Sequence, residues 1–263
     1  MICATFSFPG AYNCLMAAAV FIALRTGYAS AIRQGVSPRD GLWLALVTVA
    51  SGYVGSKLMM CITYPALFQP THMDFWLSAG TFYGGLVGAL LSLQIAAYLK
   101  RISVGLVLDA AAPALALGQV FGRTACFAAG CCWGTATDVC WGVCFSREQC
   151  RDTGVPFGVA LHPVQIYEAA LCLVLYWWLR SVAIKRRMKG SVASSYLVAY
   201  GVVRFNTEWF RDDPRGDVCG LTSLIGLSTS QMISILLISA GLIANASLAH
   251  RARQTASAPG DGP

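Results

Sequence analysis

Long runs of apolar residues, separated by shorter polar segments, dominate the pattern of this chain. Several runs approach the roughly 20 residues that an α-helix needs to cross a bilayer. The pattern therefore predicts an all-α integral membrane protein with about seven transmembrane helices in a single multi-pass domain, residues 1–253. We expect these helices near residues 11–31, 41–63, 79–99, 103–122, 162–181, 192–211 and 226–249.

Two segments depart from this pattern. A loop near residues 123–161 is rich in cysteine, and residues 254–263 contain mostly Ala, Ser, Gly and Pro. We expect the second segment to be disordered, because it offers little apolar surface to bury. Within the fourth run, Asp109 and Pro113 interrupt the apolar sequence. A membrane helix tolerates such a proline where neighbouring groups satisfy the freed carbonyl.

Composition and charge limit the classes of partner. Apolar residues make up 56% of the chain and charged residues 12%, with a net charge of +7. The basic residues cluster between the apolar runs and form no surface stripe, which argues against nucleic acid as a partner. Twelve of the 19 Lys and Arg residues follow the first, third, fifth and seventh helices, and six lie on the other side. This bias predicts an amino end outside and a carboxyl end in the cytoplasm.

Lone charges beside the apolar runs are the strongest functional signal, because a charge at membrane depth costs at least about 2.5 to 3.5 kcal/mol. Arg123 ends the fourth run, and Arg204 and Arg211 belong to the sixth. They run against the charge bias. We expect them to form a positive pocket near the lipid headgroups, where a guanidinium binds phosphate through two hydrogen bonds. Tyr200, Arg204 and Glu208 are four residues apart, so Glu208 can orient Arg204; the alternative is an ion pair that only holds helices together.

Six sequence blocks together carry a family resemblance. The blocks are residues 82–88, 122–134, 141–143, 162–168, 200–211 and 226–231. In this order, over roughly residues 12–241, the chain resembles the prolipoprotein diacylglyceryl transferases. These seven-helix bacterial enzymes move the diacylglyceryl group of phosphatidylglycerol onto the cysteine thiol of a lipoprotein precursor and release glycerol phosphate. The resemblance implies the bacterial inner membrane, an anionic phospholipid such as phosphatidylglycerol, and a lipoprotein precursor as partner.

The resemblance also implies roles for individual residues. Arg123 is similar to the arginine that the family uses on the lipid phosphate, Arg204 and Glu208 to its essential charged pair, and Tyr12 to a tyrosine near the lipid site. Small residues such as Gly84 let a helix or a lipid approach the backbone closely. The substrate-binding residues expected in this way are Arg123, Tyr200, Arg211, Tyr12, Gly84, Gly85 and Gly134, and the catalytic candidates are Arg204, Glu208, Tyr83 and His162.

The chain departs from the family pattern at two places. Tyr83 stands where the family has a histidine proposed to activate the incoming thiol, and a tyrosine with an ordinary pKa of about 10 is a weak base near neutrality. Cys126, Ala129 and Cys131 stand where the family has two amides and a carboxylate. The anion-binding part of the pattern is therefore kept, while its hydrogen-bonding part is rewritten.

Cysteines gather in the same region. Of eleven cysteines, six lie within 25 residues: Cys126, Cys131, Cys132, Cys140, Cys144 and Cys150. One interpretation is disulfides that staple an extracytoplasmic loop. Another is a thiol nucleophile or redox pair at Cys126, Cys131 or Cys132, because the nearby Arg123 lowers a thiol's pKa. Metal binding is the least favoured, since the Cys131–Cys132 doublet lacks the two-residue gap of a zinc knuckle. We therefore predict no metal and no cofactor.

Two residues of the fifth helix complete the set of candidates. His162 precedes Pro163 at the start of the helix, so capping or hydrogen bonding competes equally with acid–base work. Glu168 is interpreted as local scaffold that needs a partner near the membrane surface.

Three hypotheses for function follow. The first is a phospholipid-dependent transferase of the family's type, in which Arg123, Arg204 and Arg211 hold the headgroup. The second is a lipid-modifying relative with a different acceptor and a cysteine nucleophile. The third is a non-enzymatic relative that binds anionic lipid or a partner protein. The first leads, because the arginines that would bind phosphate are present.

Overall fold

The computed structural model describes residues 10–63, 65, 72–77, 80–185, 188–213 and 226–257. Within these residues the fold is helical, and the extended backbone forms only isolated β-bridges. The predicted all-α class is therefore confirmed. The chain divides into two compact units: unit 1 comprises Met1–Thr26 and Ala111–Pro263, and unit 2 comprises Gly27–Ala110.

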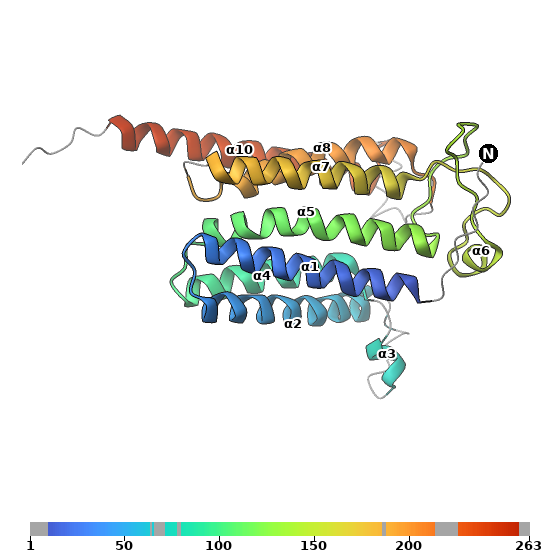
Figure 1. Cartoon of the computed structure of the whole chain (residues 1–263), viewed down its shortest axis with the longest axis horizontal. Helices are drawn as coiled ribbons and strands as arrows, with labels where there is room; N and C mark the ends of the chain where they lie inside the picture. Colours follow the sequence, from blue (N-terminus) through green and yellow to red (C-terminus); the bar gives the residue numbers. More distant parts are fainter. Residues whose placement is uncertain are drawn as a thin grey trace, which may run out of the picture. The chain divides into compact units, whose positions relative to one another are not determined.

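Seven long helices correspond one to one to the seven predicted runs (Figure 1). They are α1 (Ala11–Arg33), α2 (Pro38–Thr63), α4 (Phe82–Leu99), α5 (Val104–Ala129), α7 (Val164–Lys185), α8 (Ser191–Thr207) and α10 (Thr229–Ser257). Shorter elements are α3 (Met73–Leu77), α6 (Arg147–Thr153) and the 3-10 turn η2 (Glu208–Phe210). Six of the long helices are long and apolar enough to cross a membrane, and α8, with 17 residues, is just shorter. The chain is thus a multi-pass membrane protein.

The structure corrects three predicted boundaries. Helix α5 continues through Arg123 to Ala129, seven residues past the predicted end at 122, so the cysteine-rich loop starts at Gly130. The cause is that Arg123 has an acidic partner on another helix, which offsets the cost of a charge inside a span. The sixth run ends in the turn η2 and not in α-helix. Helix α10 extends to Ser257, so residues 254–257 of the expected disordered tail are helical, and residues 258–263 lie outside the described part.

In unit 2, α2 and α4 pack backbone against backbone through glycines. A Cβ atom added to Gly55 would lie 2.5 Å from the carbonyl oxygen of Gly84, and one added to Gly88 would lie 2.5 Å from that of Ser51. Side chains larger than hydrogen do not fit at such positions without a shift of the helices. Close approach of this kind is a main source of helix association in lipid, where burial of apolar surface gives little driving force.

In unit 1, α7, α8 and α10 lie side by side (Figure 1). Leu175 and Leu179 of α7 and Val192 of α8 form a buried core with two alanines of α5, Ala112 and Ala116. This core joins α5 and α7 to the first turns of α8. It therefore holds the three helices together within unit 1.

The segment between α5 and α7, residues 130–163, is folded and is called the cap below. Ser146 and Gln149 form a capping box at the start of α6, and Gln149 also donates a hydrogen bond to the Ala128 carbonyl at 2.8 Å. Trp133 and Leu161 belong to a buried cluster inside this segment. The described cysteines are all free thiols in the structure: Cys14, Cys61, Cys126, Cys131, Cys132, Cys140, Cys144, Cys150 and Cys172. Hydrogen bonds and apolar packing hold the described cap, and of the interpretations of its cysteines, the structure does not bear out the disulfides.

Candidate functional site

An ion pair between α5 and α7, which a residue of α8 also contacts, forms the centre of the site in unit 1. The Nη2 atom of Arg123 on α5 lies 2.9 Å from Oε1 of Glu168 on α7, whose side chain is 1% exposed. The hydroxyl of Tyr200 on α8 donates a hydrogen bond to the same oxygen at 3.2 Å. Glu168, predicted to need a partner, therefore has two. Its two contacts connect α5 and α8 through one carboxylate.

A second ion pair lies where α8 ends and η2 begins. Arg204 and Glu208 are 2.7 Å apart, as their spacing predicts, and both residues are buried. Arg204 also donates a hydrogen bond from Nη2 to the hydroxyl of Ser230 on α10, at 2.7 Å. Glu208 thus orients the guanidinium, and the hydrogen bond to Ser230 connects α8 to α10.

Arg211 leaves the helical spacing predicted for it. It follows η2 in extended backbone and forms an isolated β-bridge with Gly134 of the cap. Its Nε and Nη2 atoms donate two 2.9 Å hydrogen bonds to the Asp213 carboxylate. A Cβ atom on Gly134 would meet the carbonyl oxygens of His162 and Phe210 at 2.5 and 2.7 Å. Gly134 is therefore required where two backbone segments cross beside Arg211.

The three arginines are linked by electrostatic interactions. Tyr200 interacts electrostatically with both Arg123 and Arg204, and Arg211 interacts with Arg123. The structure therefore brings together the positive residues that the sequence singled out. Each of them has a carboxylate partner, which makes the burial of three like charges tolerable.

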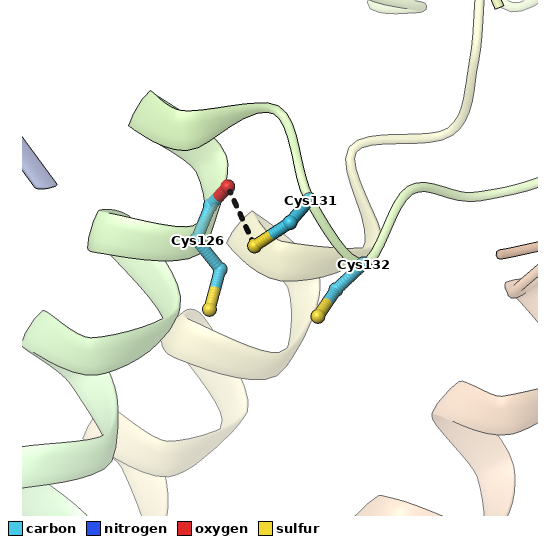
Figure 2. Close-up of side chains that lie close together, drawn as sticks. All are labelled: Cys126, Cys131 and Cys132. Carbon is cyan, nitrogen blue, oxygen red and sulfur yellow. Dashed lines mark hydrogen bonds between the residues drawn. The ribbon is translucent and has the colours of Figure 1, made fainter. Parts of the chain in front are cut away.

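Three cysteines gather where α5 ends (Figure 2). The sulfur atoms of Cys126, Cys131 and Cys132 are all within 4.8 Å of one another, and the thiol of Cys131 lies 3.6 Å from the Cys126 carbonyl oxygen. Hydrogen bonds from the other two thiols, followed by the charges of Arg211 and Arg123, lower the pKa of Cys132. The same thiol contacts raise the pKa of Cys131. Cys132 is thus the thiol of the cluster whose pKa is lowered.

Tyr12 and His162 occupy different surroundings within unit 1. Tyr12, in the first turn of α1, interacts electrostatically with all three clustered cysteines, which places it at the site. His162 contacts Tyr167 and Phe210 edge to face, and its Nδ1 lies 3.1 Å from the Tyr167 hydroxyl. That hydroxyl accepts a hydrogen bond from the Trp141 indole, so its own proton is available for Nδ1. These contacts fit the hydrogen-bonding role for His162.

Tyr83, Gly84 and Gly85 belong to unit 2. The side chain of Tyr83 is half exposed, and its ring meets Phe82 edge to face at 5.8 Å. A Cβ atom on Gly84 would overlap the Gly55 carbonyl and Met59, whereas one on Gly85 would lie 3.3 Å from the Gly52 carbonyl. Helix packing alone therefore explains glycine at position 84.

Comparison with known proteins places this arrangement in a family. The family model of prolipoprotein diacylglyceryl transferase matches residues 6–246. Among similar proteins, phosphatidylglycerol–prolipoprotein diacylglyceryl transferase 2 of Clostridium perfringens is 36% identical over 205 residues, 75% of each chain. The phosphatidylglycerol–prolipoprotein diacylglyceryl transferase of Clostridium tetani is 34% identical over 201 residues, 76% of this chain and 77% of the relative. That of Bordetella parapertussis is 32% identical over 211 residues, 77% and 76% of the two chains.

The chain belongs to the prolipoprotein diacylglyceryl transferase family. The match spans six of the seven long helices completely and most of α10. The resemblance drawn from six sequence blocks is thereby confirmed.

Within this family member, the sequence interpretation missed three contacts of the site. Glu168 is the partner of Arg123, Ser230 is a partner of Arg204, and Asp213 binds Arg211. A signal existed only for Glu168, because a carboxylate in the first turns of an apolar helix needs a partner. Asp213 and Ser230 resemble ordinary polar loop and helix-start residues, so the sequence offered no reason to select them.

Proposed function

We propose that this chain transfers the diacylglyceryl group of phosphatidylglycerol to the cysteine thiol of a lipoprotein precursor. The observation that carries the proposal is the cluster of Arg123, Arg204 and Arg211 at one end of unit 1, in a chain of this family. Each guanidinium has five N–H donors. The ion pair of Arg123 with Glu168 uses Nη2, so its other nitrogens can bind a phosphate.

The chemistry follows from the charge that develops during transfer. The acceptor sulfur forms a bond to the terminal glyceryl carbon of the lipid as the bond from that carbon to the phosphate oxygen breaks. The electron pair of the broken bond leaves with glycerol phosphate, and the thiol proton passes to solvent or to a base. Positive groups fixed at the phosphate stabilise the leaving anion more than the bound lipid, which lowers the barrier. We assign this role to Arg123 and Arg211.

Arg204 and Glu208 act as the charged pair that supports the reaction. Because both are buried and Arg204 is also bound to Ser230, the guanidinium holds one orientation. We assign substrate contacts also to Tyr200 and Tyr12, which lie at the same site. Catalytic roles for Tyr83 and His162 stay predictions, and the contacts described above account for His162 without one.

The proposal includes an orientation. The two-to-one distribution of basic residues supports an amino end outside, a carboxyl end in the cytoplasm and a site that faces the outer leaflet. Cys140, an exposed free thiol in the cap, allows a direct test. We expect a membrane-impermeant maleimide to label it in intact spheroplasts, with the Cys140→Ser protein as control. Labelling only after the membrane is opened would contradict this orientation.

The activity itself is tested with purified protein, phosphatidylglycerol and a lipoprotein-signal peptide that carries a free cysteine. We expect glycerol phosphate release and a thioether-linked diacylglyceryl peptide by mass spectrometry, both lost with Arg123→Ala and with a peptide in which serine replaces the cysteine. Glycerol phosphate release with a mass gain on the protein instead would favour a cysteine of this chain as acceptor. A folded protein without any turnover would contradict the transferase and favour a lipid-binding role.

A further inference from the structure

The end of α5 is built to bring three sulfur atoms together. The amide of Cys131 donates to the Cys126 carbonyl at 3.1 Å, and the amide of Gly130 donates to that of Phe127 at 3.1 Å. With Gly130 at a φ of +75°, this is a Schellman motif, which places the residue two positions past the helix end against the one in its last full turn. The two residues placed against each other in this way are Cys131 and Cys126.

The third sulfur is brought in by an unfavourable backbone conformation. Cys132 has a φ of +61°, a region that residues with a Cβ atom rarely occupy. Strained conformations of this kind persist where the surrounding structure imposes them and gather at functional sites. The turn sets the side chain of Cys132 beside those of Cys126 and Cys131, so that all three sulfur atoms lie within 4.8 Å (Figure 2).

We propose that Cys126, Cys131 and Cys132 form a binding site for a thiophilic cation such as Zn²⁺ or Cu⁺, with one coordination position left open. Zinc–sulfur bonds of about 2.3 Å put the sulfurs of a tetrahedral site about 3.8 Å apart, so side-chain shifts of about 1 Å complete the site. Each ligating thiol gives up its proton on binding. A disulfide, in contrast, would use two of the sulfurs and leave the third unexplained.

Two further features of unit 1 fit a bound cation. Three thiolates and a divalent cation leave a net negative charge, and Arg123 and Arg211 both interact electrostatically with Cys132. Gln165 is 1% exposed and donates to the Cys131 carbonyl at 2.7 Å, while its own Oε1 has no hydrogen-bond partner within the described residues. A buried oxygen in this state calls for a partner such as an ion or a water.

The open position suggests what the cation does. Catalytic zinc sites keep three protein ligands and one position for water or substrate, and a thiol that binds there is deprotonated. This step rests on the proposed function: the acceptor cysteine coordinates as the fourth ligand, loses its proton to solvent, and presents a thiolate sulfur to the glyceryl carbon. The protein then activates the acceptor thiol without a histidine base.

The binding test uses the reduced full-length protein in detergent, titrated with Cd²⁺ and followed by thiolate charge-transfer absorption and by metal analysis. We expect one ion per chain, which Zn²⁺ displaces. Serine at position 126, 131 or 132 should lower the affinity by more than the roughly 10- to 100-fold that loss of an outer partner costs. The matched controls Cys140→Ser and Cys150→Ser should bind as the unchanged protein does. Absence of binding by protein with free thiols, or equal binding by every variant, would overturn the site.

A second arm tests the open position apart from the transferase reaction. Adding the cysteine peptide to the Cd²⁺-loaded protein, without lipid, should strengthen the charge-transfer absorption, whereas the serine peptide should not. An unchanged spectrum with tight metal binding would overturn the acceptor role and leave the metal site standing. Metal binding and a peptide response in a protein that never releases glycerol phosphate would instead contradict the proposed function alone.

Discussion

Two groups of helices in this protein associate through different kinds of contact. In unit 2, α2 and α4 meet through glycines, with Gly55 against Gly84 and Gly88 against Ser51. In unit 1, α5, α7 and α8 meet through the buried carboxylate of Glu168. Both arrangements supply helix association that lipid alone does not drive.

This difference indicates which of the two kinds of contact can include a binding site. Backbone contact between glycines leaves no polar side chain to bind a ligand, so substitution there should affect stability first. The ion pairs cost desolvation, and a well-packed apolar pair of similar size often holds helices equally well. Buried charges kept at three neighbouring arginines are therefore better explained by a bound anion than by stability, and four predictions test this contrast.

The largest effect is expected at Arg123. Arg123→Ala leaves Glu168 buried without its cation, which should lower the free energy of unfolding by about 3 to 5 kcal/mol. The double variant Arg123→Leu with Glu168→Leu removes both charges and should recover most of that loss, but not the transferase activity. Thermal unfolding in detergent and glycerol phosphate release measure the two effects, with the exposed Arg151→Ala as control. Restored activity in the double variant would show that the pair serves only stability.

A smaller effect is expected at the second ion pair. Glu208→Gln keeps the shape but removes the charge that orients Arg204, and we expect glycerol phosphate release to fall by about 100-fold. Stability should change less than at Arg123, because Ser230 still holds the guanidinium. The exposed Glu148→Gln gives the matched control. Equal activity of the two glutamine variants would remove Glu208 from the mechanism.

The glycine interface allows a matched comparison on one helix. Ala at position 55 would place its Cβ atom 2.5 Å from the Gly84 carbonyl, whereas Ala at position 52 would make ordinary contacts at 3.4 Å. We expect Gly55→Ala to destabilise by about 1 to 3 kcal/mol and Gly52→Ala to be neutral or stabilising, since alanine favours helix by about 1 kcal/mol. Thermal unfolding decides, and equal stability of the two variants would show that α2 and α4 pack less closely.

The smallest effect is expected in the aromatic group around His162. Tyr167→Phe removes the hydroxyl that joins His162 and Trp141, and should cost about 0.5 to 1.5 kcal/mol. If His162 only holds the cap, the rate of transfer and its pH profile stay unchanged. A shifted pH profile at unchanged stability would indicate that Tyr167 orients His162 for acid–base work.

The seven helices were predictable because each is an apolar run of nearly bilayer length, and a run needs no knowledge of its neighbours. The end of α5 was not. Arg123 looks like the end of a span, but Glu168 on α7 pairs with it and the helix continues to Ala129. A contact between residues far apart in the sequence leaves no local signal.

Prediction of the site was limited in the same way, because it succeeded only for local contacts. The helical spacing of Arg204 and Glu208 predicted their ion pair, since both lie within one short segment. The gathering of three sulfur atoms depends on a left-handed turn at Cys132, a conformation that the residue type itself disfavours. The doublet therefore read as a weak metal signal, although the structure sets its two sulfurs beside a third.

The length of α8 has a consequence for the surrounding lipid. Its 17 residues cover about 26 Å at 1.5 Å per residue, less than the roughly 30 Å hydrocarbon thickness of a typical bilayer. Local thinning of the bilayer is one of the ways in which such hydrophobic mismatch is accommodated, beside snorkelling of flanking side chains and oligomerisation. We expect the leaflet to dip where this helix ends, so that a phospholipid reaches the level of the arginines while its acyl chains stay in the membrane.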